Sequence, residues 1–188
     1  ILDRAEELAL IEARDCGKPL KQARADVTAC ARYFEFYGGA SDKLHGATIP
    51  YPEGFTVLTW REPHGVTGHI IPWNYPAQIF GRSVGGALAA GNACVVKPAE
   101  DACLTPLRIA ELALEAGLPA GALNMVCGLG IEAGAALAAH TGINHMSWYV
   151  KLEHKGRDLY PRLKRAVKEN RKIYNEEQVR NEMYLALD

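Results

Sequence analysis

Polar residues that follow two apolar runs are the first candidates for chemistry in this sequence. Asn74 follows the run His69–Ile71, and Lys97 and Glu100 follow the run Ala93–Val96. A side-chain amide can stabilise an oxyanion that develops during a reaction. An ammonium and a carboxylate can each form a hydrogen bond with a ribose hydroxyl group. Both features also have a purely structural interpretation: Asn74 could cap a following helix, and the two charges could lie in a solvent-exposed loop.

Three glycines form a second candidate ligand site. Gly128, Gly130 and Gly134 give the pattern GxGxxxG between a predicted strand and a predicted helix. Glycines at such a turn let the backbone approach a ligand and leave amide N–H groups pointing outward. The spacing is one residue longer than the dinucleotide fingerprint. A tight strand-to-helix turn with a small-residue packing face therefore explains it equally well.

Histidines and cysteines give no comparable signal. His64 and His69 flank one apolar run without forming a metal-ligand pattern, so we predict no metal site. The five cysteines lack CxxC spacing and are odd in number. We interpret them as packing residues or free thiols of a cytoplasmic protein.

The elements that would position these residues alternate between strands and helices. Short β-branched runs predict strands, and segments that are rich in small residues, with Pro at the start and Gly at the end, predict helices. The expected strands are 66–71, 93–96, 123–127 and 145–148, and the expected helices are 76–90, 105–116 with Thr105 as N-cap, and 132–139. The alternation predicts an α/β fold with a Rossmann-like doubly wound parallel sheet. Ligands bind beyond the carboxyl ends of such strands, where Asn74, Lys97 and Glu100 would lie.

Two N-terminal helices and a β-hairpin precede this sheet. Residues 1–15 and 21–38 carry apolar stripes at helical spacing. Residues 46–62 predict a hairpin around Pro52-Glu53-Gly54. Because the hairpin is apolar and aromatic, it either covers part of the core or pairs with another subunit as an oligomerisation arm.

A composition shift near residue 150 divides the chain. Residues 1–150 carry 11 Lys and Arg against 15 Asp and Glu, a balance of −4, and residues 151–188 carry 10 against 7, a balance of +3. We predict a domain over 1–150 and a basic helical extension over 151–188. Glutamates among the basic residues argue against nucleic-acid binding, and a solvated helix face explains the charges instead. No apolar run approaches the roughly 20 residues of a membrane span.

Four blocks of the sequence, in this order and spacing, resemble the amino-terminal portion of the NAD(P)-dependent aldehyde dehydrogenase superfamily. The blocks are REPHGVTGHIIPWNYP, ALAAGNACVVKPAE, TPLRIAELALEAGLPAGALNMVCGLGIEAGAALAAH and GINHMSW. The family oxidises an aldehyde to a carboxylic acid through a cysteine thiohemiacetal, transfers hydride to NAD(P) and hydrolyses a thioester. The resemblance covers residues 1 to about 148.

The resemblance implies a role for each candidate residue. Asn74 would stabilise the thiohemiacetal oxyanion, and Lys97 and Glu100 would contact the adenosine ribose. A carboxylate at Glu100 favours NAD over NADP. Further cofactor-binding residues would be Ile71, Pro72 and Trp73 along the cleft, with Gly130 and Gly134 beside the adenine.

The sequence also departs from the family pattern. After His145-Met146-Ser147 the family continues with Phe-Thr-Gly-Ser, whereas this chain continues with Trp148-Tyr149-Val150-Lys151. The turn glycine and the phosphate-binding serine are thus missing, and so are the family's nucleophilic cysteine and general-base glutamate. We therefore expect a truncated chain that binds the dinucleotide weakly and has no dehydrogenase activity alone. Separately, we expect the chain to form a homo-oligomer. The alternative function is a non-catalytic assembly module that uses the hairpin and the helical tail.

Overall fold

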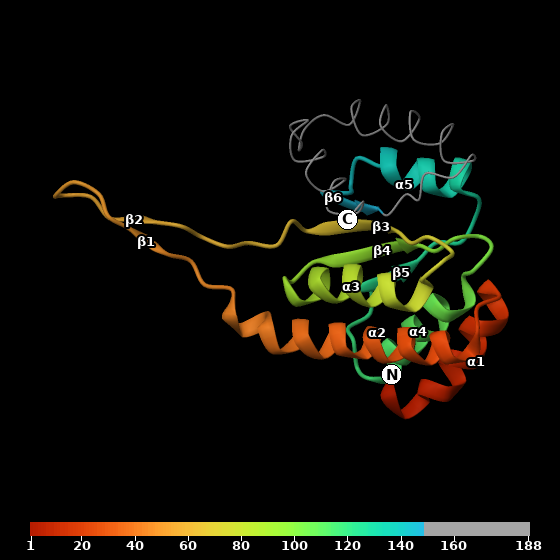
Figure 1. Ribbon diagram of the computed structural model, residues 1–188. Coiled ribbons are helices and arrows are strands. Elements are labelled where there is room, and N and C mark those ends of the chain that lie inside the picture. Colours follow the sequence, from red (N-terminus) through yellow and green to blue (C-terminus); the bar gives the residue numbers. More distant parts are fainter. Residues whose placement is uncertain (149–188) are drawn as a thin grey trace.

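A parallel sheet between helical layers forms the body of the computed structural model, which describes residues 1–148 (Figure 1). The predicted helical extension over 151–188 lies outside the described residues. Within residues 1–148 the sheet has four strands in the order β5-β4-β3-β6, all paired in parallel. Their bounds are β3 Val66–Ile70, β4 Ala93–Lys97, β5 Leu123–Met125 and β6 His145–Trp148.

Helices cover both faces of this sheet. The chain runs from β3 through α3 (Pro76–Ala89), β4 and α4 (Leu104–Glu115) to β5, which places α3 and α4 on one face. A π-helical turn (Gly130–Gly134) and α5 (Ala135–Ala139) follow, and β6 then pairs with the other side of β3. A methyl group on Gly68 would overlap Met146 Sδ and lie 3.4 Å from Leu137 Cγ, so α5 packs closely against β3. The predicted doubly wound α/β fold is confirmed.

The N-terminal helices form an outer layer on the α3 and α4 side. A 3₁₀ turn (Leu2–Arg4) leads into α1 (Ala5–Cys16), and α2 (Leu20–Ala40) ends in a second 3₁₀ turn (Ser41–Lys43). Helix α2 lies along α3 because Gly81 admits it: a methyl group there would lie 2.9 Å from Cys30 Sγ and 3.0 Å from its backbone. Helix α1 packs against α2 and α4.

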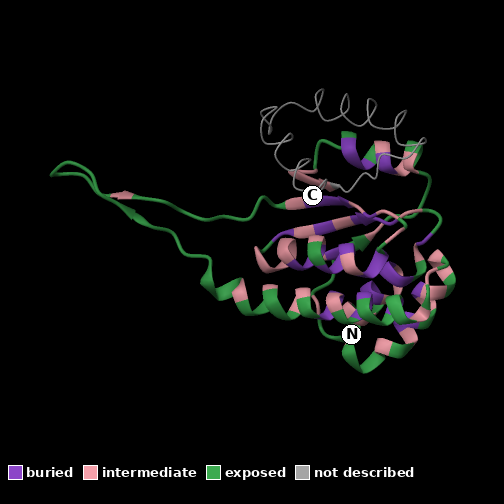
Figure 2. Ribbon diagram, in the orientation of Figure 1, coloured by how far each residue is buried: buried purple, intermediate pink, exposed green. Residues whose placement is uncertain are grey.

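One apolar core joins the outer helices to the sheet. Figure 2 shows buried residues on the strands and on the facing sides of the helices. The largest fully buried apolar side chains come from α1, α2, α3, the end of β3 and α4, respectively Leu8, Val27, Phe80, Ile71 and Ile109. Each contributes about 1.5–3 kcal/mol relative to an exposed position. Helices α1 and α2 are therefore integral to the domain.

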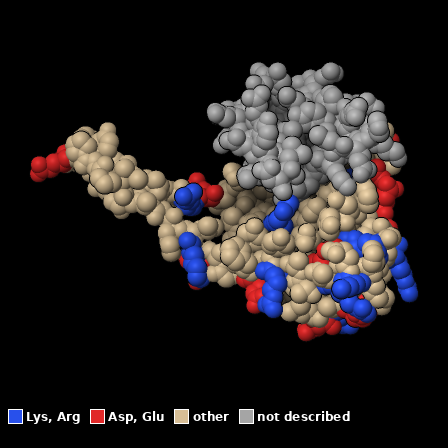
Figure 3. Space-filling view, in the orientation of Figure 1, with Lys and Arg blue, Asp and Glu red and all other residues tan. Residues whose placement is uncertain are grey.

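The hairpin projects from the body as an arm (Figure 1). Strands β1 (Thr48–Ile49) and β2 (Val57–Leu58) pair antiparallel over two residue pairs, so they are shorter than the strands that the sequence predicts over 47–51 and 55–62. Arm aromatics face solvent, with Trp60 79% exposed and Phe55 71% exposed. Figure 3 shows an arm of mostly uncharged surface with an acidic tip. The arm does not pack against the core, so the interpretation of the hairpin as a cover for the core is wrong. Pairing of the arm with another subunit stays a prediction.

Within residues 1–148, no helix combines the length and the apolar character that crossing a bilayer requires.

Candidate functional site

Strand pairing brings the two predicted polar loops to one edge of the sheet. Ile70 pairs with Lys97, and the Ile71 N–H donates to the Lys97 carbonyl oxygen at 2.9 Å. The loop that carries Asn74 therefore starts beside the end of β4. Strand order also reverses here, because β4 and β5 extend the sheet on one side of β3 and β6 on the other. A switch point of this kind is where open α/β sheets bind ligands.

Asn74 lies in the loop between β3 and α3, and its side-chain oxygen accepts no hydrogen bond from the described residues. Oδ1 is buried and has no hydrogen-bond partner within residues 1–148. The N-cap residue of α3 is Tyr75, and its side chain forms no capping hydrogen bond with the helix. The interpretation of Asn74 as a helix cap is therefore wrong. A buried polar atom without a partner costs about 1–3 kcal/mol, so this amide requires another explanation.

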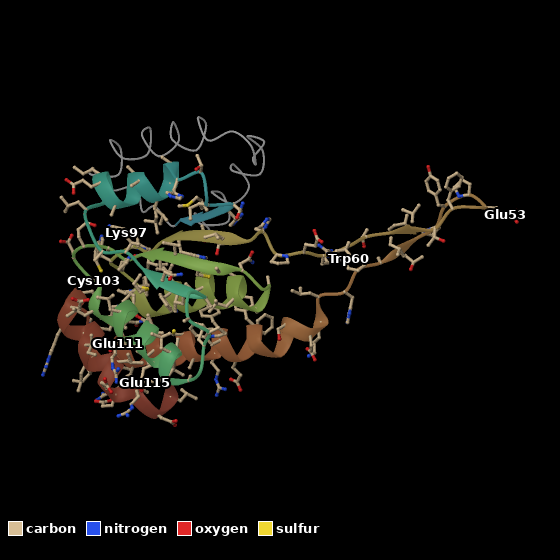
Figure 4. The ribbon with its side chains drawn as sticks, turned by 180° about the vertical axis from the view of Figure 1, so that it is seen from behind. Glu53, Trp60, Lys97, Cys103, Glu111 and Glu115 are labelled. Carbon is tan, nitrogen blue, oxygen red and sulfur yellow. The ribbon has the colours of Figure 1, made fainter. Side chains whose placement is uncertain are left out.

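Lys97 and Glu100 form an ion pair at the end of β4. Lys97 Nζ donates to Glu100 Oε2 at 2.6 Å, and the Lys97 side chain is 3% exposed, whereas that of Glu100 is 41% exposed. Burial is the largest single effect and disfavours the Glu100 carboxylate. The hydrogen bond and charge of Lys97, together with backbone N–H groups that include that of Gly130, outweigh burial and leave the pKa of Glu100 below its ordinary value. The interpretation as solvent-exposed loop charges is wrong for Lys97. Figure 4 shows Lys97 on the part of the body away from the arm.

The glycine-rich turn reaches this ion pair. The Gly130 N–H points to Glu100 Oε1 at 3.4 Å, which connects the turn after β5 to the loop after β4. Gly128 has a φ of +147°, and a methyl group there would lie 2.9 Å from Ala133 Cβ, so this turn requires glycine. Gly130–Gly134 forms a π-helical turn, not the predicted start of a helix at residue 132. Gly134 is buried next to Ile70.

The three remaining predicted cofactor residues lead from the core to the surface. Ile71 is 1% exposed and belongs to the core cluster. Pro72 is half-buried, and Trp73 is 43% exposed. The segment thus presents Trp73 at the rim of the edge that carries Asn74 and Lys97.

The structure contains a buried charge cluster that was not predicted from the sequence. Lys18 Nζ donates to Glu12 Oε1 and to Asp26 Oδ2, both at 2.7 Å, and Gln22 Nε2 donates to Asp26 Oδ1 at 2.8 Å. Glu12 is 0% exposed. Burial raises the pKa of Glu12 even though Lys18 opposes that shift. One feature of the sequence could have predicted this cluster. Glu12 lies one helical turn after Leu8, which places a carboxylate on the apolar stripe of the helix.

A second polar chain crosses the core between β3 and α3. His69 contacts Thr67 Oγ1 through Nε2 at 2.9 Å and Ser83 Oγ through Nδ1 at 2.6 Å, and Ser83 Oγ donates to Ser147 Oγ at 2.9 Å. Burial, with a smaller contribution from His145, lowers the pKa of His69 to about 4. His69 is therefore neutral at pH 7.

The cysteines and histidines of residues 1–148 form no group that could hold a metal ion, and most of the thiols have a raised pKa. No group of three or more His, Cys, Asp or Glu side chains in this part of the chain could hold a metal ion. All five cysteines are free. Burial raises the pKa of four of the thiols, namely Cys16, Cys30, Cys94 and Cys103.

The parallel sheet with its switch-point edge defines a doubly wound α/β protein with a Rossmann-like fold. The model of the aldehyde dehydrogenase family matches residues 1–169, so the chain belongs to the aldehyde dehydrogenase family. The match runs past the predicted boundary at residue 150.

Individual relatives agree with this assignment. Hydroxyisobutyraldehyde dehydrogenase of Mycolicibacterium austroafricanum is 52% identical over 148 residues, which is 79% of this chain and 29% of that protein. A solved structure from Burkholderia cenocepacia, assigned as an aldehyde dehydrogenase, is 69% identical with a TM-score of 0.85, over 90% of this chain and 35% of that one. The NAD⁺ complex of an aldehyde dehydrogenase from Bacillus cereus is 38% identical with a TM-score of 0.81, over 88% and 34%. The chain thus spans about a third of the length of these relatives.

Proposed function

We propose that the chain forms the dinucleotide-binding part of an NAD-dependent aldehyde dehydrogenase. The strongest support for this function is the Lys97–Glu100 ion pair at the switch-point edge of the sheet. The Gly130 N–H also donates to Glu100, which connects the pair to the glycine-rich turn. Lys97 Nζ has further N–H groups beyond the one it donates to Glu100, and the Glu100 carboxylate has further lone pairs. The pair can therefore donate to one ribose hydroxyl and accept from another.

The other candidate residues fit roles around the same cofactor. Ile71, Pro72 and Trp73 would line the cleft, and Gly130 and Gly134 would lie beside the adenine. NAD supplies a hydride acceptor for aldehyde oxidation when it is bound. Asn74 would direct its amide toward the oxyanion that develops on the aldehyde oxygen, a role worth about 10²–10³ in kcat in other acyl-transfer sites.

Binding of NAD and NADP to the purified chain tests the cofactor assignment. We expect a dissociation constant for NAD weaker than about 100 µM, equivalent to about −5.5 kcal/mol, because the phosphate-binding glycine and serine of the family are missing after Trp148. NADP should bind at least about tenfold more weakly, since the Glu100 carboxylate repels a 2′-phosphate. Calorimetric titration measures both constants.

The substitution Glu100→Gln should reduce the difference between the dissociation constants for NAD and NADP. Glu115→Gln is the matched control, because it removes an exposed carboxylate from the end of α4, away from the ion pair (Figure 4). Equal affinity for both dinucleotides in the wild-type chain would contradict the role of Glu100, and a low-micromolar constant for NAD would contradict weak binding.

We also propose that the 188-residue chain alone does not oxidise aldehydes. A nucleophilic cysteine must be a thiolate, and burial raises the pKa of four of the five thiols. No NADH absorbance is expected when the chain is mixed with NAD and an aliphatic or aromatic aldehyde. Steady NADH formation would contradict this proposal.

An assembly module is the second candidate function. Its support is the arm, on which Tyr51, Phe55 and Trp60 are all more than 60% exposed. Exposed aromatics of this kind mark interaction surfaces. The partner would be a second copy of the chain, and a monomer by light scattering would argue against it.

A further inference from the structure

Two carboxylates of α1 reach the loops that carry the proposed site residues. We infer that Glu12 and Asp15 are positioning residues, which hold the start of α3 and the start of α4 and thereby fix both loops at the carboxyl edge of the sheet. The identity of the positioned groups, Asn74 in one loop and Glu100 in the other, rests on the proposed function.

The start of α3 is capped from another helix. Its N-cap residue, Tyr75, contributes no side-chain cap, and Pro76 at the first helical position has no N–H. The next free donor, the Ala77 N–H, donates to Glu12 Oε2 at 3.0 Å. Sixty-five positions separate these two residues in the sequence. Glu12 thus satisfies a donor that the local sequence leaves open.

The charge balance around Glu12 favours this contact. Glu12 and Asp26 share one ammonium, that of Lys18, which leaves an excess of negative charge in a buried cluster. The N-terminus of α3 carries a partial positive charge and faces this excess. Lys18 Nζ also lies 4.8 Å from the ring centroid of Tyr75, the residue after Asn74. The cluster therefore contacts the chain at two residues that closely follow Asn74.

The start of α4 has the same arrangement. Its N-cap residue, Cys103, contributes no side-chain cap, and the Leu104 N–H donates to Asp15 Oδ2 at 2.8 Å. The predicted cap, Thr105, lies inside the helix, and its Oγ1 has no hydrogen-bond partner in the part of the chain that the structure describes. Glu12 and Asp15 are three residues apart on α1, so one helix holds the starts of α3 and α4.

Each loop is consequently fixed at both ends. The loop with Asn74 starts at β3 and ends at the residue bound by Glu12, and the loop with Glu100 starts at β4 and ends at the residue bound by Asp15. Asn74 Oδ1 makes no hydrogen bond within residues 1–148, so the backbone of its loop must orient the amide. The positions of both proposed site residues therefore depend on α1.

Amide hydrogen exchange of the full 188-residue chain, followed by NMR, tests this inference. Glu12→Met should speed exchange of the Ala77 amide by roughly tenfold and leave Leu104 unchanged, and Asp15→Ala should do the reverse, because each loses one cap. Each variant is the control for the other. Glu12→Gln and Asp15→Asn keep an acceptor oxygen and should restore slow exchange.

Two results would overturn the inference. One is faster exchange over the whole of residues 66–147 in proportion to a loss of stability in urea, since that would indicate a general packing role. The other is unchanged exchange at the amide that each carboxylate binds. Asp15 is only half-buried, so its variants test the inference even if Glu12→Met does not fold. The measurement needs no NAD. If each substitution changes exchange only at the amide it caps but the chain binds no dinucleotide, the proposed function is contradicted and the inference about Glu12 and Asp15 is not.

Discussion

Replacing Lys18 with methionine is expected to lower the free energy of unfolding by about 3–5 kcal/mol. The ammonium is mostly buried and is the cation that Glu12 and Asp26 share, each at 2.7 Å. Burial lowers the pKa of Lys18, but the hydrogen bonds and negative charges of these two carboxylates together outweigh burial and raise the pKa above the ordinary value. Methionine would therefore leave two buried carboxylates without their cation.

Lys43→Met is the matched control for this substitution. Lys43 is an exposed lysine that pairs with Asp42 on the surface, and its loss should change stability by less than about 0.5–1 kcal/mol. Urea unfolding at pH 7 of the wild-type chain and both variants gives the comparison. A Lys18 variant that loses less than about 1 kcal/mol would contradict the structural role of the buried cluster.

Acidification is expected to reduce stability through His69. Its pKa is about 4 in the folded chain because of burial, whereas an unfolded histidine has a pKa of about 6.5. The unfolded state therefore binds a proton first, so stability falls as the pH drops below about 6.5 and this contribution levels off below about 4. The shift corresponds to about 3 kcal/mol in total. His145, whose pKa is lowered by burial and by His64, adds to the effect in the same direction.

A substitution at His69 isolates this contribution. Urea unfolding at several pH values between 7 and 4 should give a smaller loss of stability for His69→Gln than for the wild-type chain. His45→Gln, at an exposed position on the arm side of the molecule, should keep the wild-type pH dependence. The same pH dependence in all three chains would show that His69 is not buried in a neutral form.

The sheet was predictable because its signals are local. Short β-branched runs that end at proline or lysine identified β3 and β4 almost to the residue, and Pro76 correctly marked the start of α3. The helix α4 was misjudged at its start: Thr105 has the side chain of an N-cap, but Asp15 provides the cap from a distance of 89 positions. No local pattern contains such a contact.

Long-range contacts also explain the rest of the site. The predicted edge did bring Asn74, Lys97 and Glu100 to neighbouring loops, since parallel strands end together. The sequence could not show that Lys97 is buried or that Gly130 faces Glu100, because both depend on how the turn after β5 packs. The strands of the hairpin were predicted too long, because apolar runs and a turn do not supply a surface against which the strands can pack.

Titration of the ¹⁵N-labelled chain with NAD, followed by amide NMR spectra, tests the central claim most directly. The account predicts that millimolar NAD shifts the signals of Lys97, Glu100 and Gly130, and leaves those of the β1–β2 arm unchanged. Unchanged signals at the carboxyl edge of the sheet, or shifts confined to the arm, would contradict the assignment of this edge as the cofactor site.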